Sequence, residues 1–410
     1  MSPSSASRIV SYDEAAHLVR REAERFLARA HNSERLPLLQ AAGRVVAEPI
    51  LADRDQPPFP RSTRDGFACR AAELERDDLR IAGLLRAGQP WSGGELSAGH
   101  AIEIMTGAAV PPGADCIVMV EHVRVREGRV QLNGQHRPAV GENIVPAGAE
   151  AKHADAVLPA GRRLGAAEIA AAAACGAAEV PAFARPRAAI LATGDELVDI
   201  AQAPLAHQIR NSNSYSLAVQ VTAAGGEPEL FPIVRDDVEE TEAAVRRAMD
   251  CDLILLTGGV SMGKFDYVEP ALLSAGAEFL FTGVRMQPGK PVVFGRIVQK
   301  PFFGLPGNPI STMVTFALFV APVLRALGGE SGIEPRFRMA RLQEDVTVKT
   351  GLTRFLPARL ESDVRGATVR RIPWQGSGDL TSAARANAFL VVPEDREKLG
   401  AEEIVTVLEL

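Results

Sequence analysis

The sequence predicts a multidomain protein of the α/β plus β class, built around a mainly parallel α/β sandwich domain. The first observation is the length of 410 residues, which is too long for one ordinary hydrophobic core. The second is a series of apolar runs between residues 186 and 312 that alternate with helical patterns. Three of these runs end in glycines, hydroxyls or carboxylates, as buried parallel strands do. Ligands of open α/β sheets bind at the edge formed by the carboxyl ends of the parallel strands, so we expect the functional site there.

Four structural parts are expected along the chain. Residues 1–52 and 146–182 form an elongated linker and dimerisation domain of helical and extended segments, and residues 53–145 are a β-rich domain inserted into it. Residues 183–330 form the α/β domain, and residues 331–410 form a small C-terminal β-barrel.

The N-terminal part begins with an amphipathic helix. Ser11 and Glu14 have the spacing of a capping box, and apolar residues then recur at helical spacing through about Ala30. Its apolar face needs a partner, either the rest of the domain or another subunit. Three prolines within residues 53–64 exclude a helix and favour an extended linker. Short segments with frequent turn signals up to residue 145 then predict a small β-rich domain.

The α/β domain alternates strands and helices. Helices are expected at residues 214–224 and 238–249, with a strand at 229–234 between them. The second helix has acidic residues in its first turns and basic residues later, which complements the helix dipole. Such alternation predicts right-handed βαβ units. The last 80 or so residues are short strands with turns, which predict a small barrel or sandwich.

Composition excludes several classes of protein. The net charge of -6 offers no global basic field for nucleic acid. We find no apolar stretch of signal-peptide length near the start and none long and uncharged enough to span a bilayer, so we expect a cytoplasmic protein without membrane contact. The four cysteines are far apart, which predicts reduced thiols rather than disulfides or a zinc site.

Two strand-end segments are candidate anion sites. In the first, residues 257–263, the glycines can adopt positive φ, so that successive backbone amides can surround an anion. In the second, residues 306–311, Asn308 is placed to cap a helix and Pro309 suits its first position, so that the free amides at the helix start can bind an anion. Each is also explained by ordinary turn or helix-start chemistry. The candidate ligand-binding residues in them are Gly258, Gly259, Ser261, Pro306, Gly307, Asn308, Pro309 and Ser311.

Three carboxylates and one lysine complete this edge. Glu196, Asp236 and Asp266 each follow a predicted strand, and carboxylates converging there suit a hard cation, most naturally Mg²⁺ beside phosphate. Taken singly, each carboxylate fits a helix cap or a solvated loop residue better than a metal ligand, and only the set of three on successive strand ends favours the cation site. Lys290 lies on the rigid turn Pro288-Gly289-Lys290-Pro291, where it can hold an oxyanion as a point charge.

Together with two patches outside this domain, the motifs resemble one family, the molybdopterin molybdenumtransferases, which comprise bacterial MoeA and the E domain of gephyrin-like proteins. The resemblance spans nearly the whole chain in the family's order. The matching motifs are Thr63-Arg64-Asp65-Gly66-Phe67-Ala68, Met105-Thr106-Gly107-Ala108, Thr193-Gly194-Asp195-Glu196-Leu197, Arg235-Asp236-Asp237, Thr257-Gly258-Gly259-Val260-Ser261, Pro288-Gly289-Lys290-Pro291, Leu305-Pro306-Gly307-Asn308-Pro309 and Gln375-Gly376-Ser377-Gly378.

This resemblance implies the last step of molybdenum cofactor synthesis, in which molybdate is inserted into adenylylated molybdopterin and AMP is released. It implies an elongated homodimer, with the adenylyltransferase that supplies the substrate as a further partner. Residues 183–330 become the molybdopterin-binding domain. The positions that match functional residues are Asp65, Thr106, Glu196, Asp236, Asp266 and Lys290, with Ser311 and Ser377 associated with molybdate or the pterin.

The chain departs from the family pattern where positive charge is expected. Gln287 and Gly283 stand at two lysine positions, and Leu352 stands at an arginine position, with Arg354 close by. The lost charges favour an alternative, a non-catalytic carrier of molybdopterin or the finished cofactor with the same fold. The retained carboxylates favour the enzyme. A generic nucleotide-binding α/β protein would leave the motifs around Asp65 unexplained.

Overall fold

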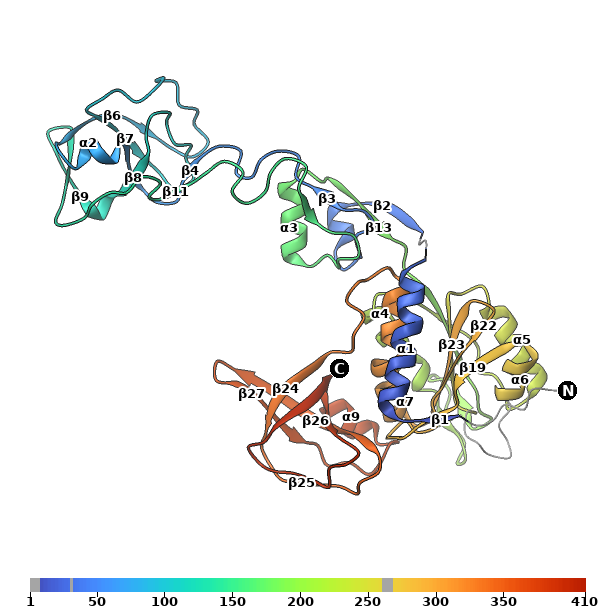
Figure 1. Ribbon diagram of the computed structural model, residues 1–410. Coiled ribbons are helices and arrows are strands. Elements are labelled where there is room, and N and C mark those ends of the chain that lie inside the picture. The colour runs from blue at the N-terminus through green and yellow to red at the C-terminus, as the bar shows by residue number, and fades with distance from the viewer. Residues whose placement is uncertain (1–7, 30–31, 260–267) are drawn as a thin grey trace.

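The protein has a compact body from which a narrow arm extends, with a β-rich domain at the far end of the arm (Figure 1). The computed structural model describes residues 8–29, 32–259 and 268–410. Two candidate site residues, Ser261 and Asp266, lie outside these ranges. The body contains the α/β domain and the C-terminal β domain side by side.

A six-stranded sheet forms the centre of the α/β domain. Its order is β17 (Glu227–Leu230), β14 (Arg187–Ala192), β18 (Leu253–Thr257), β23 (Lys300–Leu305), β22 (Val293–Ile297) and β19 (Ala277–Phe281). The first four strands run in the same direction, β22 is antiparallel to β23, and β19 is antiparallel to β22, so the predicted mainly parallel sheet is confirmed. The sheet strands buried on both faces are continuous apolar runs, as strands covered on two sides must be.

The helices of this domain are α4 (Asn213–Ala223), α5 (Val238–Ala248), α6 (Val268–Ser274), α7 (Pro309–Thr315) and α8 (Ala321–Leu327). A π-helical turn, Phe316–Val320, joins α7 to α8 in one continuous helix. This helix, Pro309–Leu327, is the one in the described ranges that is long and apolar enough to cross a membrane. Because 78% of its most apolar window is buried inside the protein, it is a core helix of the body.

Helix α1 (Tyr12–Leu27) packs against α8 in the body. Its N-cap is the predicted one, since Ser11 Oγ accepts a hydrogen bond of 3.1 Å from the Glu14 amide. Its apolar residues, among them Val19 and Phe26, are buried in the same core as the α/β domain. The expectation that this face contributes to the linker domain or to a second subunit is therefore wrong: its partner is α8 of the same chain.

The arm joins two segments that are far apart in the sequence. Strand β2 (Ser33–Pro37) pairs with β13 (Glu179–Phe183), and β3 (Ile50–Leu51) pairs with β12 (Ala156–Leu158). Helix α3 (Ala166–Ala174) covers these strands with a small apolar core. The inserted domain then follows through the pair β4 (Arg61–Ser62) and β11 (Ile144–Val145).

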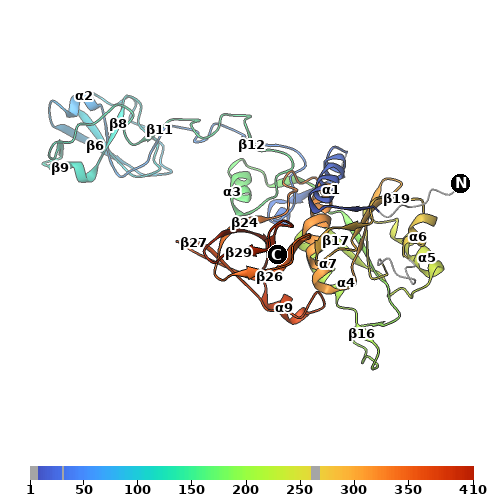
Figure 2. The ribbon, with the colours of Figure 1, turned by 60° about the horizontal axis from the view of Figure 1, so that its bottom comes forward.

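The inserted domain is a six-stranded sheet, which confirms its predicted β-rich character (Figure 2). The order is β8 (Cys116–Met119), β5 (Gly66–Cys69), β7 (His100–Ile104), β6 (Leu79–Leu85), β10 (Arg129–Leu132) and β9 (Val123–Arg126), with the short helix α2 (Ala71–Leu74). The four cysteines of the chain are buried and unbridged.

The C-terminal domain is a closed β-barrel, as predicted. The order is β21 (Met286–Gln287), β26 (Thr353–Asp363), β27 (Gly366–Arg371), β24 (Phe337–Leu342), β30 (Ile404–Glu409) and β28 (Ala388–Val392), and β28 also pairs with β26 to close it. Strand β21 comes from the α/β domain, so it ties the barrel to the body. The short remaining elements are β1 (Ile9–Val10), β15 (Leu197–Val198), β16 (Ile209–Arg210), β20 (Gly283–Val284), β25 (Val346–Thr347), β29 (Lys398–Leu399), α9 (Leu380–Arg385) and the 3₁₀ turns η1 (Leu38–Ala41) and η2 (Val120–His122).

Candidate functional site

The ends of three neighbouring parallel strands meet at one edge of the α/β sheet. Thr193 follows β14 and donates its amide to the Thr257 carbonyl, at 2.9 Å. Gly258 follows β18 and donates to the Leu305 carbonyl at the end of β23, at 3.3 Å. The predicted strand-end segments are therefore neighbours in space.

The two glycines after β18 are required by their surroundings. Gly258 has φ +93° and Gly259 has φ +60°, a region that L side chains rarely adopt. A Cβ on Gly258 would lie 2.3 Å from the Thr193 carbonyl oxygen, and one on Gly259 would lie 2.8 Å from Thr193 Oγ1. The loop thus lies directly on Thr193, with no space for a side chain.

Asn213, the first residue of α4, holds two strand-end loops together. Its Nδ2 donates to Thr257 Oγ1 at 2.9 Å and to the Gly307 carbonyl at 2.8 Å. Thr312 Oγ1 donates to the neighbouring Pro306 carbonyl at 2.6 Å. Asn213 was not among the predicted site residues. The available signal was a second Asn in the run 211–213 at the start of a helix, a position where Asn is an ordinary cap.

Two polar atoms at this edge, Asn213 Oδ1 and Thr193 Oγ1, are buried and have no hydrogen-bond partner among the residues that the structure describes. An unsatisfied buried polar atom costs about 1–3 kcal/mol, so such atoms are uncommon in a folded protein. Two such atoms at the strand ends mark this edge as a place where the protein tolerates a local cost, as functional sites do.

The start of α7 receives a segment of the barrel domain. Asn308 is the N-cap and Pro309 the first helical residue, although the Asn308 side chain makes no capping hydrogen bond. The Ile310 amide donates to the Ser377 carbonyl at 3.0 Å. We expected free amides here for an anion, and this one is already taken. Ser311, only 4% exposed, lies one residue further along the helix. Ser377 is thus brought to the same edge.

Carboxylates gather on the other side of the Thr193 strand end. Asp195 and Glu196 follow β14, and the Asp236 amide donates to Asp195 Oδ1 at 3.4 Å. Burial raises the pKa of Asp236, and the carboxylates of Asp195 and Glu196 raise it further. The structure therefore brings Glu196 and Asp236 together. Within residues 8–29, 32–259 and 268–410, no three ligand side chains gather closely enough to form a metal site by themselves.

The turn that carries Lys290 packs against α7. Gly289 has φ +109°, and a Cβ there would lie 2.7 Å from Thr315 Cγ2. The Lys290 side chain is exposed and makes no ion pair with a residue in the described ranges. Across the β21–β26 pair, Gln287 lies opposite Arg354, whose Nε and Nη2 both donate to the Lys349 carbonyl. The barrel thus places an arginine beside the turn.

Asp65 and Thr106 form a compact pair in the inserted domain. Asp65 Oδ1 accepts hydrogen bonds from the Thr106 amide at 2.7 Å and from Thr106 Oγ1 at 2.8 Å. The amide bond is the main reason that the pKa of Asp65 is lowered, so this exposed carboxylate is ionised. Both residues belong to the inserted domain, which lies at the far end of the arm, away from the α/β sheet of the same chain (Figure 1).

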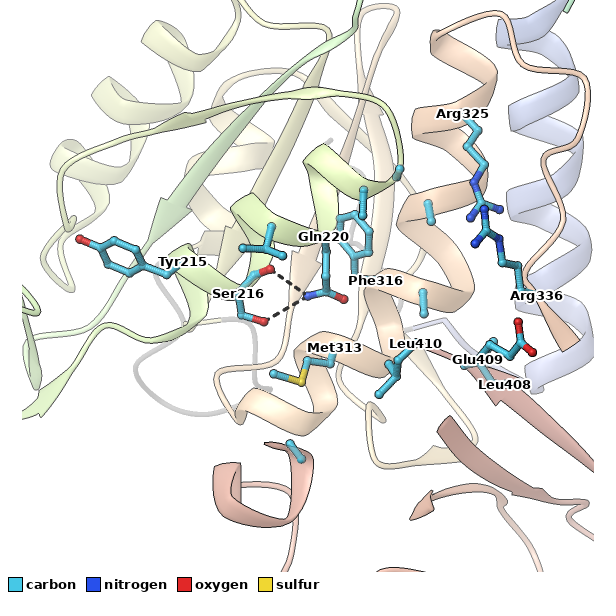
Figure 3. Close-up of a pocket in the computed structure, with 16 residues that line it drawn as sticks. Tyr215, Ser216, Gln220, Met313, Phe316, Arg325, Arg336, Leu408, Glu409 and Leu410 are labelled. Carbon is cyan, nitrogen blue, oxygen red and sulfur yellow. Dashed lines mark hydrogen bonds between the residues drawn. The ribbon is translucent and has the colours of Figure 1, made fainter. Parts of the chain in front are cut away.

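A separate apolar groove of about 590 Å³ lies between α4, the α7–α8 helix and β30 (Figure 3). Met313 and Phe316 line its apolar part, and the side chains of Arg325 and Arg336 point toward each other at one end. Burial lowers the pKa of Arg325. None of the candidate site residues that the structure describes is among those that line this groove.

Comparison with known proteins covers most of the chain. Residues 10–176 match the family described as "MoeA N-terminal region (domain I and II)", and residues 189–326 match "Probable molybdopterin binding domain". Residues 339–410 match "MoeA C-terminal region (domain IV)". A molybdopterin molybdenumtransferase of Nostoc sp. is 35% identical over 398 residues, which cover 92% of this chain and 89% of the relative. The chain belongs to the molybdopterin molybdenumtransferase family.

Further relatives agree with this assignment. A molybdopterin molybdenumtransferase of Staphylococcus aureus is 32% identical over 379 residues, with 90% of each chain covered. The crystal structure of a molybdopterin biosynthesis MoeA protein from Pyrococcus horikoshii is 30% identical, with a TM-score of 0.81 over 98% of this chain and 100% of that one. The protein is a transferase of molybdenum cofactor biosynthesis, which confirms the predicted family, fold class and enzymatic function.

Proposed function

We propose that this molybdenumtransferase inserts molybdate into adenylylated molybdopterin and releases AMP at the strand-end edge of the α/β domain. The observation that carries the proposal is the meeting at one edge of the Gly258–Gly259 loop, the start of α7 and the Glu196–Asp236 carboxylates. The backbone amides of the loop suit an anion, and the two carboxylates on neighbouring strand ends suit a divalent cation, so this edge can bind both.

The two anions of the reaction would be bound by different parts of this edge. The backbone of Gly258 and Gly259, with the loop of residues 306–309, would hold the phosphate and pterin of the substrate. Molybdate, a tetrahedral dianion, would be held by Lys290 together with the hydroxyls of Ser311 and Ser377.

Glu196 and Asp236 fit a hard divalent cation such as Mg²⁺. Burial raises the pKa of Asp236, and the nearby carboxylates of Asp195 and Glu196 raise it further; a bound cation would favour its ionised form. Asp266 would join them as the third carboxylate. When bound, the ion would neutralise negative charge that develops as the adenylyl phosphoanhydride is cleaved. The protein's own part is to hold the substrate phosphate beside these carboxylates.

The position of Asp65 and Thr106 supports a homodimer. Both residues lie on the arm, so they would act at the site of a partner subunit, with the inserted domain covering that site and excluding water. We propose that the partner docks on α4, where Val219 is 70% exposed and Tyr215 is 40% exposed beside the apolar groove. The upstream adenylyltransferase would deliver the substrate in the cytoplasm.

The test is to incubate the purified protein with adenylylated molybdopterin, Mg²⁺ and molybdate. We expect AMP release that requires molybdate, and reconstitution of an apo-molybdoenzyme by the product. Binding of the substrate with no AMP release under any metal would instead support the alternative, a carrier of molybdopterin. The carboxylates of Glu196 and Asp236 favour the enzyme, because a carrier has no need of metal-binding carboxylates.

A further inference from the structure

One arginine connects the arm to the body. Arg163 belongs to the arm, and its Nη1 donates to the carbonyl of Gly43, also in the arm, at 2.8 Å. From there the guanidinium reaches two segments of the body. Nε and Nη2 donate to the two carboxylate oxygens of Glu330, at 3.0 Å and 2.5 Å, and Nη2 also donates to the Ala224 carbonyl at 3.1 Å.

These contacts use the full geometry of a guanidinium. Arg163 and Glu330 are 27% and 12% exposed, so their paired hydrogen bonds are shielded from water. Ala224 is the C-cap of α4, where the helix dipole favours a positive charge. A lysine would supply the charge without the planar fork. Nearby, Ser331 donates its amide and its hydroxyl to the Gly161 carbonyl, at 3.0 Å and 3.1 Å.

The arm does not need Arg163 for its own fold. Its strands pair with each other, and its apolar core contains Val46, Leu158, Leu164 and Val180. Glu330 and Ala224 lie outside that core, on the body side of the joint. Loss of the guanidinium therefore removes the contacts across the joint and one hydrogen bond within the arm, to Gly43, and leaves the strand pairs and the apolar core of the arm in place.

We infer that Arg163 is a positioning residue for the transferase reaction, which fixes the angle between arm and body so that Asp65 and Thr106 are presented to the site they serve. The inference rests on the proposed function, in which the arm contributes to turnover. The angle between arm and body is thus set at the joint and not by the residues of the strand-end edge. A small change of angle at the joint becomes a large displacement at the far end of the arm (Figure 1).

The first test measures the arm itself. Nitroxide labels at Arg126→Cys on the inserted domain and Glu239→Cys on α5 report their separation by pulsed electron resonance, because the four native cysteines are buried. Labelled chain is diluted into an excess of unlabelled chain, so that distances within one protomer dominate. We expect Arg163→Gln to broaden the distance distribution and Arg163→Lys to broaden it less.

The matched control is Arg162→Gln. Arg162 is the neighbouring arginine, but its Nε and Nη2 donate to Glu168 of the same arm, at 2.9 Å and 2.6 Å. The Arg162→Gln variant loses the same charge but none of the contacts between arm and body, so its distance distribution should match that of the parent. An unchanged distribution in Arg163→Gln would overturn the inference, as would equal broadening in Arg162→Gln.

The second test measures turnover. In Arg163→Gln, kcat should fall by roughly tenfold to a hundredfold, because misplacement by about an ångström has effects of that size. The KM for adenylylated molybdopterin should stay within about twofold of the parent, because the pterin site lies in the body. Circular dichroism and thermal unfolding confirm that the variant is folded. A broadened arm with unchanged kcat would overturn the inference.

A parallel Asp65→Asn variant separates this inference from the proposed function. If Asp65→Asn turns over normally, the arm contributes no essential carboxylate and the proposed role of the arm fails, whatever Arg163 does. If Asp65→Asn is inactive while Arg163→Gln keeps both its arm distances and its kcat, the proposed function stands and the positioning role is refuted.

Discussion

Replacing Gly258 with alanine tests whether the loop after β18 must lie directly on Thr193. The added Cβ would meet the Thr193 carbonyl oxygen at 2.3 Å, and real Cβ contacts stay beyond 3.0 Å. The loop or the strand end must therefore retreat by at least 0.7 Å, the difference between these distances. The positive φ of +93° adds strain for any L side chain, of about 1–2 kcal/mol.

A second glycine in the same domain separates the two effects. Gly276 has φ +80°, and a Cβ there meets nothing within 4 Å. Gly276→Ala should therefore lower the free energy of unfolding by the strain alone, about 1–2 kcal/mol. Gly258→Ala should lower it by an additional amount, about 1–3 kcal/mol, because the contact overpacks the strand end.

The functional readout should diverge more than stability does. A displacement of 0.7 Å at the loop should weaken pterin binding and lower kcat/KM by about tenfold or more. Gly276→Ala should keep the parent kcat/KM. Calorimetric titration with molybdopterin, AMP release and thermal unfolding of both variants check these values. If the two variants behave alike in binding and turnover, the loop is not part of the substrate site and the reasoning fails.

Three further predictions concern charged groups of the site. Because the pKa of Asp236 is raised in the folded protein, its contribution to stability is lost as the pH rises through that pKa. In scanning calorimetry, Asp236→Asn should therefore raise the Tm of the metal-free protein by about 1–4 °C at neutral pH and give no such increase in acid. The same variant should show no increase in Tm when Mg²⁺ is added. The pKa of Asp65 is lowered, so the ionised carboxylate that we expect to act is lost only as the pH falls through the pKa of the folded protein. Thr106→Val removes one of the two hydrogen bonds to Asp65 and should move the acidic limb of the pH–rate profile to higher pH, whereas an unchanged limb would show that Asp65 has no part in turnover. Lys290→Ala should raise the molybdate concentration for half-maximal AMP release by about ten- to a hundredfold, whereas Lys398→Ala, whose ammonium pairs with a carboxylate on the barrel, should not; equal titrations would place the molybdate site elsewhere.

Local patterns in the sequence were sufficient for much of the fold. The buried strands β14 and β18 are short apolar runs bounded by turn residues, and Ser11 caps α1 with the predicted bond. These features depend on neighbouring residues, so the sequence reveals them directly. The predicted boundary of α1 near residue 30 was late, since the described helix ends at Leu27.

Long-range pairings could not be predicted. The apolar face of α1 is covered by α8, almost 300 residues later, and a helical pattern states only that some partner exists. The opposition of Gln287 and Arg354 depends on a pairing between two domains, which no local pattern encodes. The same holds for the bond between Ile310 and Ser377 at the start of α7.

The candidate site divides in the same way. Glu196 and Asp236 were predicted from their places after strands, and the structure brings them together. Asp65 was identified only through the family resemblance, because an Asp-Gly turn is common chemistry. Asn213 was missed, since its two bonds to different strand ends become visible only when the sheet is assembled.

If the strand-end edge cleaves the adenylyl group as molybdate is inserted, AMP release in a single turnover must depend on Glu196. Parent and Glu196→Gln proteins are loaded with adenylylated molybdopterin and Mg²⁺, and molybdate is then added. We predict that the parent releases AMP in proportion to the molybdate incorporated, and that Glu196→Gln retains the substrate without releasing AMP. Normal AMP release by Glu196→Gln, or tight substrate binding by the parent with no release at any molybdate concentration, would contradict the account.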